Sequence, residues 1–471
     1  MAAQILALTE QVQVLTQREQ THAAENAMLR AKVEELEARL KKDSSNSSRP
    51  PSSDPPWKSR PPRRAPSGKK PGGQPGHPGT TRPLAPPERV DEGHDVRPAQ
   101  CSKCGSQDLV DTGEPPHRHQ VTELPPIRVR VIEHRLHAMR CRSCGERTVA
   151  ALPPEVPPGR FGLRLEATVA YMSGALRLTK REIQRFFDEL LDVDLGLGTV
   201  PAIEGRVARA LEHSYRDVQR SLREGDLCFV DETSWREARR RVWLWGGTDG
   251  KVALLRVDRR RNRGAFRRLF AGVFRGFLVT DRLAVYDSHR LDRRQTCNAH
   301  LLRDLEGFVV GPRAGRTFGN AGRRILGRLF GLWHRFQERV LSRERLEQRM
   351  GRVRERLTAL LEGAKDHAYA RVRRFAAHLL PRIDAVFGFL RCERAEPTNN
   401  RSERLLRRAV LWRKSSYGTA SAGGSRFVER ILTTVATLRM QGRGVLDYIV
   451  DAMQAWHLGT PSPSLRPPPA A

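Results

Sequence analysis

Apolar residues recur along this chain at heptad, helical and strand spacing, and the changes of spacing divide it into segments. The first segment, residues 1–42, places apolar side chains on one heptad seam: Ile5, Leu8, Val12, Leu15, Leu29, Val33, Leu36 and Leu40. Glu19, His22 and Asn26 interrupt the seam, and a buried Asn at such a position fixes register and oligomer state in coiled coils. The pattern predicts a coiled-coil oligomerisation helix. The alternative is a single amphipathic helix packed on the body of the protein.

The heptad pattern stops at residue 43. Residues 43–99 are rich in Pro, Ser, Gly and basic residues and hold too few apolar residues to build a core, which predicts a disordered linker. Its basic residues are able to lie along DNA phosphates: Arg60, Arg63, Arg64, Lys69 and Lys70. A tether that only improves solubility would explain the same composition.

Two Cys-x-x-Cys-Gly motifs lie in residues 100–155. Cys101 and Cys104 form the first pair, and Cys141 and Cys144 form the second. Each following glycine permits a tight turn, and four thiolates fill the tetrahedral shell of Zn²⁺, so a structural zinc site is predicted. Residues 128–137 alternate like a strand, which predicts a DNA-binding zinc ribbon. A redox motif, the alternative, would need no second pair. The histidines of this segment are expected at the surface: His117, His119, His134 and His137.

Helical periodicity begins after the second cysteine pair. Residues 163–175, 180–191 and 200–222 predict three helices, with a break at 192–198. A short helix, a turn and a longer basic helix fit a helix-turn-helix reader. Residues 160–222 are therefore predicted to form a helical, helix-turn-helix-like DNA-binding segment.

Strand patterns dominate residues 225–310. We expect strands at 227–230, 241–246, 252–257 and 277–280, a helix at 262–271, and a fifth strand-like run at 295–300 that leads into a helix at Leu301. Three meandering strands, a helix and a strand that returns beside the first form an α/β layout. Three further segments follow: a helical, Arg-rich insertion at 311–391, the last helices of this core at 392–458, and a disordered tail at 459–471.

Two of the predicted strands run directly into a carboxylate. Asp231 follows Cys228-Phe-Val, Asp281 follows Phe277-Leu-Val-Thr, and Glu403 lies in a later segment of helical character. An acid at the end of a buried strand lies at a sheet edge, where a metal ion can reach it. Such a set suits two Mg²⁺ ions held roughly 3.5–4 Å apart for phosphoryl transfer. For any one acid alone, the alternative is a solvated loop residue.

The charge of the chain indicates its partner. Lys and Arg number 84 and Asp and Glu number 53, a net charge of +31. Such an excess favours a polyanionic partner, most simply nucleic acid. No apolar run reaches transmembrane length and no signal peptide is evident, so we expect a cytoplasmic, nucleoid-associated protein with no membrane partner. Four of the seven cysteines stand in pairs, which indicates metal binding in a reducing compartment.

Three further motifs stand out: Val230-Asp-Glu-Thr233, Cys297-x-x-His300-Leu-Leu-Arg303, and Glu396-Pro-Thr-Asn-Asn-Arg-Ser-Glu-Arg404, which continues through Arg413-Lys414. With the cysteine pairs, Asp43–Asp54 and the linker run Gly72-Gly-Gln-Pro-Gly-His-Pro-Gly79, they resemble the DDE-type transposases of the insertion sequence 66 family over nearly the whole chain. One departure is Arg282, where relatives commonly have glycine after the second aspartate. It bears on the geometry of that loop.

The resemblance implies an RNase H-like catalytic domain and a DDE transposase activity. Asp231, Asp281 and Glu403 would bind two Mg²⁺ (or Mn²⁺) ions for DNA strand cleavage and strand transfer at the ends of an insertion sequence. Such catalysis depends on positioning and charge neutralisation. The implied partners are double-stranded DNA (element ends and target), further copies of the chain, and accessory proteins encoded by the element.

Residues around these motifs are predicted to contact DNA: Asn399, Asn400, Arg404, Arg407, Arg413, Lys414, His300 and Arg303. Asn399 and Asn400 share a helix face with Glu403, so they are also placed to orient that carboxylate. For each basic residue the alternative is an ordinary solvated face. Cys297 and His300 could be half of a metal site, but because no second pair is evident, packing and DNA contact are favoured.

The third acid has six rivals after Asp281: Asp287, Asp292, Asp304, Glu306, Glu393 and Glu396. The first two are expected in the loop of Asp281, the next two begin a helix before the insertion, and the last two precede Pro397, which favours extended geometry before it. Glu403 alone is expected on a helix that fixes its carboxylate against the sheet edge.

Two other functions fit the sequence. A non-catalytic DNA-binding transposase relic predicts the loss of one acid, whereas all three are present. An RNase H-like nuclease that cuts without joining would keep all three.

Overall fold

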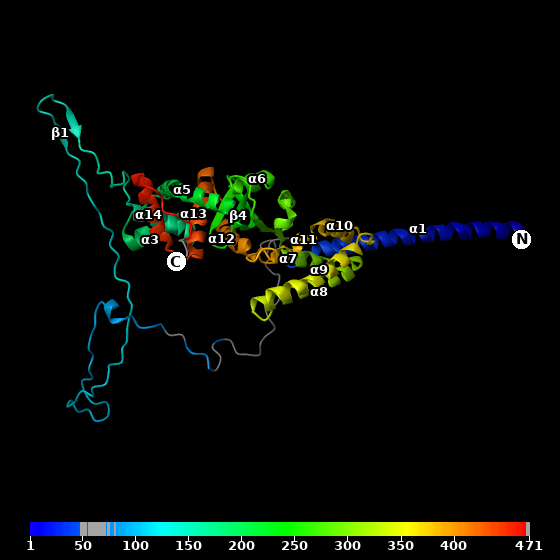
Figure 1. Ribbon diagram of the computed structural model, residues 1–471, viewed down its shortest axis with the longest axis horizontal. Coiled ribbons are helices and arrows are strands. Elements are labelled where there is room, and N and C mark those ends of the chain that lie inside the picture. Colours follow the sequence, from blue (N-terminus) through cyan, green and yellow to red (C-terminus); the bar gives the residue numbers. More distant parts are fainter. Residues whose placement is uncertain (48–53, 55–71, 73–75, 80–81, 468–471) are drawn as a thin grey trace. The chain divides into compact units, whose positions relative to one another are not determined.

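The computed structural model describes residues 1–47, 54, 72, 76–79 and 82–467, and Figure 1 shows their elements. The chain forms two compact units: Met1–Pro55 together with Arg130–Ala471, and Pro56–Val129. The predicted linker lies partly outside the described residues. Its candidate DNA-binding positions lie entirely outside them: Arg60, Arg63, Arg64, Lys69 and Lys70.

A five-stranded sheet of order β5-β4-β3-β6-β7 lies in the larger unit. Its strands are β3 (Leu227–Glu237), β4 (Arg240–Thr248), β5 (Ala253–Asp258), β6 (Phe277–Thr280) and β7 (Arg294–Thr296). The first three form an antiparallel meander, whereas β6 lies parallel to β3 and β7 parallel to β6. Between β5 and β6 runs α6 (Arg263–Leu269), capped by the Asn262 side chain. The predicted return of a strand beside the first one is confirmed.

The fifth strand is shorter than predicted. β7 ends at Thr296, and Cys297 is already the N-cap of α7 (Asn298–Val309). The predicted strand over residues 295–300 is therefore wrong after Thr296. Cys297 and His300 lie at the start of a helix.

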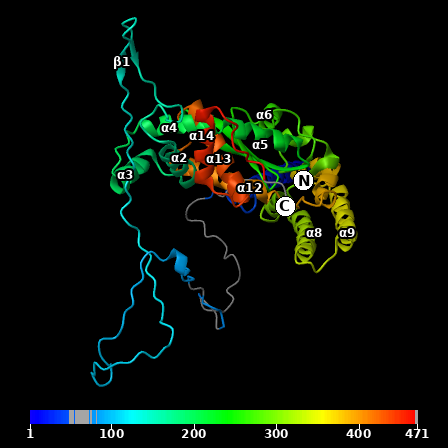
Figure 2. The same ribbon diagram turned by 60° about the vertical axis from the view of Figure 1, so that its left-hand side comes forward.

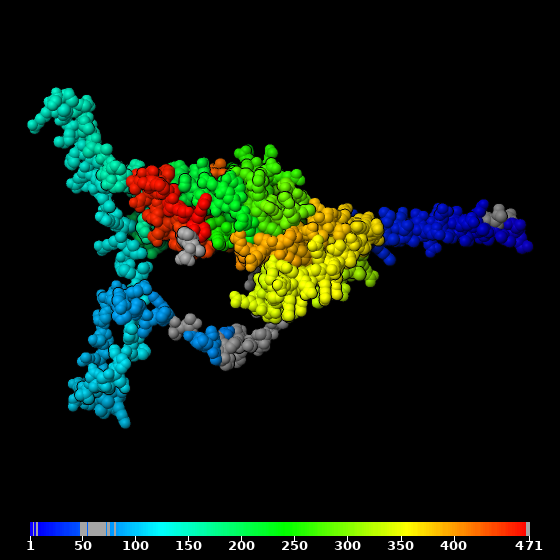
Figure 3. All heavy atoms as spheres, in the orientation of Figure 1, coloured from blue at the N-terminus to red at the C-terminus, as the bar shows by residue number. Residues whose placement is uncertain are grey.

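Both faces of the sheet are buried. Alternate side chains of a strand point to opposite faces, and accordingly Cys228 and Val230 belong to one hydrophobic core while Leu227 and Phe229 belong to another. Helices that contribute to the first core include α2 (Leu163–Tyr171), α4 (Thr199–Ala210), α5 (Glu212–Glu224), α13 (Ala422–Met440) and α14 (Val445–Leu458). Figure 2 shows α13 and α14 beside the green strands, and Figure 3 shows the packed atoms of the green and red segments.

Helix α13 closes one edge of the sheet. Three outward N–H groups of β5 donate to its side chains: Val257 to Glu429 Oε1 at 2.5 Å, Leu255 to Thr433 Oγ1 at 2.9 Å, and Ala253 to Thr437 Oγ1 at 3.0 Å. Four residues of helix and two residues of strand both span about 6–7 Å, so the two series stay in step. An edge strand that would otherwise be open to pairing is thereby satisfied.

The segment predicted as helix-turn-helix-like contains more helices than expected. The helix expected at 163–175 is α2 followed by a π-helical turn, Met172–Leu176, and α3 (Lys180–Leu191) has the predicted bounds, with Thr179 forming a capping box. The helix expected at 200–222 is instead divided at the buried Leu211 into α4 and α5. The break lets α5 turn onto the sheet, where Tyr215 donates to the Leu255 carbonyl at 3.0 Å.

The insertion is helical, as predicted. It consists of α8 (Arg313–Gln337), α9 (Arg343–Glu362), α10 (Ala370–Leu379) and α11 (Ile383–Val386). With α7 these helices form the second core, and α8 and α9 run side by side in Figures 1 and 2. Short 3₁₀ turns connect the elements of the larger unit: η4 (Ala284–Ser288), η5 (Leu291–Arg293), η6 (Leu380–Arg382) and η7 (Gly388–Leu390).

The C-terminal segment is ordered further than predicted. After α12 (Asn400–Ser416), α13 and α14, the chain continues along the body, where Leu465 is fully buried. The Pro463 carbonyl accepts hydrogen bonds from Ser214 (3.0 Å) and Tyr448 (2.6 Å), and Arg466 pairs with Asp217. The predicted disordered tail is therefore wrong over residues 459–467, because proline-rich composition does not show these specific contacts.

The N-terminal helix α1 (Ala2–Leu40) forms as predicted and leaves its apolar seam in solvent. The eight seam residues are 45–87% exposed: Ile5, Leu8, Val12, Leu15, Leu29, Val33, Leu36 and Leu40. Near its end, Glu34 accepts a hydrogen bond from the Arg313 amide at 2.7 Å. No helix in the described residues is both long and apolar enough to cross a membrane.

The zinc-ribbon segment carries less strand than predicted. In the smaller unit the one regular element among the described residues is the turn η2 (Pro87–Arg89). In the larger unit, β1 (Ala138–Arg140) and β2 (Arg147–Val149) form a hairpin around the second cysteine pair. The strand expected at residues 128–137 is wrong: this run pairs with no strand in the described part of the chain, and an unpaired strand has no ladder to stabilise it.

Candidate active site

The register of the sheet brings two aspartates together. Phe229 of β3 lies beside Val279 of β6 in a parallel pair. Asp231 and Asp281 each follow two residues later, so their side chains leave adjacent strands in the same direction. The carboxylate oxygens of Asp231, Glu232 and Asp281 all lie within 4.8 Å of one another.

Glu232 is a member of this cluster that the sequence analysis did not single out. Its carboxylate is buried and accepts hydrogen bonds from Arg261 Nε at 2.8 Å and from the Tyr286 hydroxyl at 2.5 Å. These partners occupy Glu232, whereas neither Asp231 nor Asp281 has an ion-pair partner among the described residues. The adjacent acid was visible in the sequence, but its partners lie 29 and 54 residues away.

Burial and mutual repulsion keep these acids from ionising easily. Desolvation, with the neighbouring charges of Glu232 and Asp281, holds the pKa of Asp231 well above its usual range. Desolvation also raises the pKa of Asp281, against the lowering effect of its bond from the Leu283 amide. Closely spaced, partly desolvated acids fit a site for a hard divalent cation, whose charge would compensate theirs.

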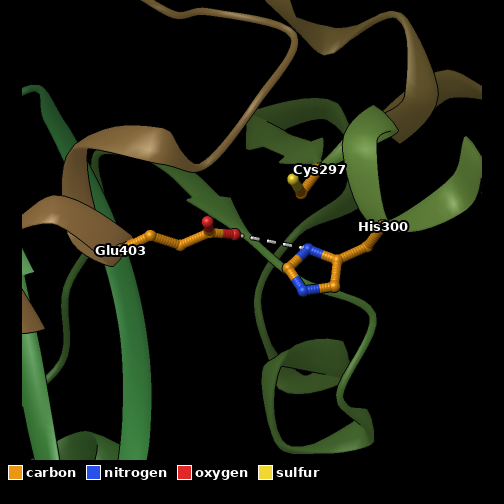
Figure 4. Close-up of side chains that lie close together, drawn as sticks. All are labelled: Cys297, His300 and Glu403. Atoms are coloured by element: carbon orange, nitrogen blue, oxygen red, sulfur yellow. Dashed lines mark ion pairs between the residues drawn. The ribbon is translucent and has the colours of Figure 1, made fainter. Parts of the chain in front are cut away.

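Glu403 approaches this cluster from the first turn of α12. Desolvation raises its pKa, Arg303 lowers it, and the negative charge of Asp281 raises it again. Its Oε1 lies 3.6 Å from Arg303 Nη2 and 3.8 Å from His300 Nδ1 (Figure 4). Burial, with the charges of Arg303 and Arg282, lowers the pKa of His300 to about 4, so its imidazole is neutral near pH 7.

Asn399 is a structural residue of the site. It is fully buried, its Nδ2 donates to the Val230 carbonyl at 2.8 Å, and its amide N–H donates to Cys297 Sγ at 3.3 Å. The start of α12 is thereby fixed to β3 one residue before Asp231. The prediction that Asn399 contacts DNA is wrong, because its side chain is fully buried.

Of the other predicted DNA contacts, three residues contact other side chains of the site and four are exposed. Arg413 is half-buried and donates to Thr233 Oγ1 at 3.0 Å and Ser234 Oγ at 2.7 Å, so it fastens α12 to β3. His300 and Arg303 lie against Glu403. The remaining residues are exposed on α12: Asn400, Arg404, Arg407 and Lys414.

The six acids considered as alternatives to Glu403 have other surroundings. Five are paired with arginine: Asp287 with Arg294 and Arg382, Asp292 with Arg290, Asp304 with Arg282, Glu306 with Arg323, and Glu396 with Arg401. Glu393 is exposed. Arg282, the departure from the family pattern, thus anchors the loop after Asp281 to α7.

Each cysteine pair forms a knuckle by itself. In the first, Gly105 donates to the Cys101 carbonyl at 2.9 Å; in the second, Gly145 donates to that of Cys141 at 2.9 Å. Both glycines have φ of 75°, the left-handed conformation that the predicted tight turn requires. Bonds from backbone N–H groups lower the pKa of Cys101 and of Cys141, which favours the thiolates that zinc binds. The predicted surface histidines are all exposed: His117, His119, His134 and His137.

Comparison with known proteins identifies the class of this chain. Residues 158–426 match the family described as "Transposase IS66 family", and residues 98–145 match the zinc-finger binding domain of transposase IS66. Residues 3–83 match a family of unknown function, DUF6444. The uncharacterized protein y4qI of Sinorhizobium fredii (strain NBRC 101917 / NGR234) is 23% identical over 417 residues, which cover 80% of this chain and 74% of that protein. Because the transposase match covers more than half of the chain, the protein belongs to the IS66 transposase family. Its zinc-finger segment supports Zn²⁺ binding, as predicted.

Proposed function

We propose that this protein is a DDE transposase that cleaves DNA strands at the ends of an insertion sequence and joins them to target DNA. Asp231, Asp281 and Glu403 form the catalytic triad, on a sheet and helix arrangement of the RNase H-like kind. The observation that carries the proposal is the parallel register of β3 and β6, which brings two half-buried aspartates without ion-pair partners among the described residues side by side, with Glu403 close enough to interact electrostatically. Glu403 also lies 3.6 Å from Arg303, and its electrostatic coupling to both Asp231 and Asp281 supports it as the third member.

The three carboxylates fit two Mg²⁺ or Mn²⁺ ions. When bound, such ions supply charge neutralisation and activate water or a 3′-hydroxyl as the nucleophile. Asp231 and Asp281 hold fixed positions because β3 and β6 fix their backbones and the Leu283 amide donates to Asp281 at 2.9 Å. Protons retained by these acids leave for solvent when the cluster ionises. Asn399 and Arg413 keep α12 in place, so the carboxylate of Glu403 stays within reach of the aspartates.

DNA is the partner that the charge, the zinc finger and the family support. We assign phosphate contacts to the exposed residues of α12: Asn400, Arg404, Arg407 and Lys414. In the helix-turn-helix-like segment, α3 is the best candidate reader, because only Ile183 and Phe187 of its residues are buried. The exposed seam of α1 supports self-association as a coiled coil, which would bring two element ends together.

Strand-joining assays separate this proposal from its alternatives. Purified protein, Mg²⁺, a duplex carrying the element end and a target plasmid should give plasmid joined to the duplex through its 3′ end. Asp281→Asn should keep DNA binding and lose both cleavage and joining. Cleavage without joining by the unaltered protein would indicate a nuclease, and binding without cleavage would indicate a relic.

A further inference from the structure

The larger unit holds two clusters of metal-binding side chains with different chemistry. The cluster of Asp231, Glu232 and Asp281 offers only oxygen. The second cluster consists of Cys297, His300 and Glu403, and it offers sulfur, nitrogen and oxygen within 4.8 Å of one another. Oxygen ligands suit Mg²⁺, whereas thiolate and imidazole ligands favour Zn²⁺ and related ions.

The sequence showed two metal-binding side chains, Cys297 and His300, and the structure adds a third from a helix distant in sequence. Cys297 and His300 begin α7, and Glu403 extends toward them from α12, as Figure 4 shows. His300 Nδ1 and Glu403 Oε1 are 3.8 Å apart. Two ligands on one tetrahedral zinc are separated by about 3.3–3.8 Å, given zinc–ligand distances of about 2.0–2.3 Å. The three atoms therefore need only small movements to bind one ion.

Two of these atoms lack hydrogen bonds. His300 Nδ1 and Glu403 Oε1 are both buried, and neither has a hydrogen-bond partner within the described ranges. Buried polar atoms in folded proteins are nearly always bonded, because leaving one unpaired costs about 1–3 kcal/mol. An ion between them would satisfy both atoms at once. Cys297 is fully buried, and its Sγ accepts a hydrogen bond from the Asn399 amide at 3.3 Å. It lies beside His300 and Glu403.

One neighbour opposes cation binding. Arg303 Nη2 lies 3.6 Å from the same Glu403 oxygen, so an arriving ion competes with a guanidinium for that carboxylate. We therefore expect a metal ion to bind more weakly here than at the four thiolates of the zinc finger, where the ligands need not be shared with an arginine.

We propose that Cys297, His300 and Glu403 form a binding site for a thiophilic divalent cation such as Zn²⁺ or Co²⁺, distinct from the zinc finger. As the metal–sulfur bond forms, the Cys297 thiol releases its proton to solvent, and the neutral imidazole and the carboxylate donate lone pairs. Water completes the coordination shell. A consequence, which rests on the proposed function, is that an ion here withdraws Glu403 from the aspartates and slows strand cleavage.

Cobalt titration of the full-length protein tests the site directly. The zinc finger is first loaded with one equivalent of Zn²⁺, which fills the tighter four-thiolate site and leaves the second site empty, and Co²⁺ does not readily displace that ion because zinc binds such ligands more tightly. Further Co²⁺ should produce a thiolate-to-cobalt charge-transfer absorption that saturates at one ion per chain. The band should disappear in Cys297→Ser, weaken at least tenfold in apparent affinity in His300→Gln, and persist in Cys392→Ser, which removes another free thiol. No band in the unaltered protein, or a band that persists in Cys297→Ser, overturns the proposal.

Inhibition of cleavage tests the consequence separately. Micromolar Zn²⁺ added to a Mg²⁺ reaction should slow cleavage by the unaltered protein at least several-fold, measured against its own rate without zinc. Cys297→Ser should resist this inhibition. Equal inhibition of both proteins contradicts the shared use of Glu403. If the unaltered protein does not cleave DNA at all, the proposed function fails, and the cobalt titration still decides whether the metal site exists.

Discussion

At the residue scale, backbone register rather than ion pairing holds the aspartates in place. Asp231 and Asp281 are half-buried beside each other with no counter-ion among the described residues, whereas Glu232 pairs with Arg261, Asp287 with Arg294 and Glu403 with Arg303. Such a pair costs stability unless a cation occupies the site. These two aspartates therefore connect stability, pH and metal binding.

Magnesium should stabilise the fold more strongly as pH rises. The pKa values of Asp231 and Asp281 are raised in the folded protein, so the folded state keeps protons that the unfolded state has released. This contribution to stability is present at low pH and is lost as pH rises through the folded pKa values. Because metal must displace those protons, its affinity and stabilisation increase over the same range.

Calorimetric melting with and without Mg²⁺, at about pH 6 and about pH 8, measures this linkage. The increase in melting temperature should be larger at the higher pH and should vanish in Asp231→Asn. An equal increase at both pH values, or one retained by the variant, would argue against metal binding by this cluster.

Asn399 should contribute to stability rather than to DNA binding. Asn399→Ala leaves the buried Val230 carbonyl without its 2.8 Å donor, so the free energy of unfolding should fall by about 1–3 kcal/mol. Asn400→Ala alters the adjacent, exposed residue and should change the free energy of unfolding by no more than about 0.5 kcal/mol. Denaturant unfolding of both variants checks this, and similar losses would show that the bond to Val230 is unimportant.

At the scale of elements, the sequence pattern predicted those helix and strand bounds that depend on neighbouring residues along the chain. The bounds of β6 and α3 were predicted to the residue, because a short apolar run that ends at Thr280 and a Thr-x-x-Glu capping box are both local signals. The break at Leu211, the early end of β7 and the ordered tail were missed, because each depends on contacts with elements far away in sequence. The role of Asn399 was missed for the same reason: its acceptor is 169 residues away.

The exposed seam of α1 should drive self-association. Leu8→Glu with Leu15→Glu places two charges on the seam, and Gln13→Glu with Gln17→Glu adds the same charge at positions outside it. Light scattering should show a lower mass for the first variant alone. An unchanged mass in the first variant would mean that α1 does not mediate assembly.

At the scale of the whole molecule, the chain combines segments of different kinds. A zinc-finger segment, a helical segment and an acidic centre follow one another, and the match to the IS66 transposase family spans the last two. The sequence motifs predicted this order and a zinc-binding segment where the zinc-finger match lies, since cysteine spacing is local. They did not predict the convergence of Cys297 and His300 with Glu403, which requires α7 and α12 to be packed together.

The zinc finger should be a structural part of the protein. After a weak chelator has removed metal from the weaker site of Cys297, His300 and Glu403, the full-length chain should retain one zinc ion. Cys141→Ser should lose this ion and Cys392→Ser should keep it, because three thiolates hold zinc less well than four. Metal analysis of the purified proteins checks this. Zinc retained by Cys141→Ser would exclude the proposed ligand set.

The most direct test of the central claim is Mg²⁺-dependent cleavage of an element-end duplex by Glu403→Gln beside Glu396→Gln. Both variants remove one negative charge from neighbouring positions, but Glu403 is coupled electrostatically to Asp281 whereas Glu396 is paired with Arg401 at 2.8 Å. Glu403→Gln should bind the duplex with unchanged affinity and cleave it at least a thousand times more slowly, a change of about 4 kcal/mol in the activation free energy. Glu396→Gln should cleave within about tenfold of the unaltered rate. Cleavage that survives in Glu403→Gln, or is lost instead in Glu396→Gln, would contradict the assignment of the catalytic triad.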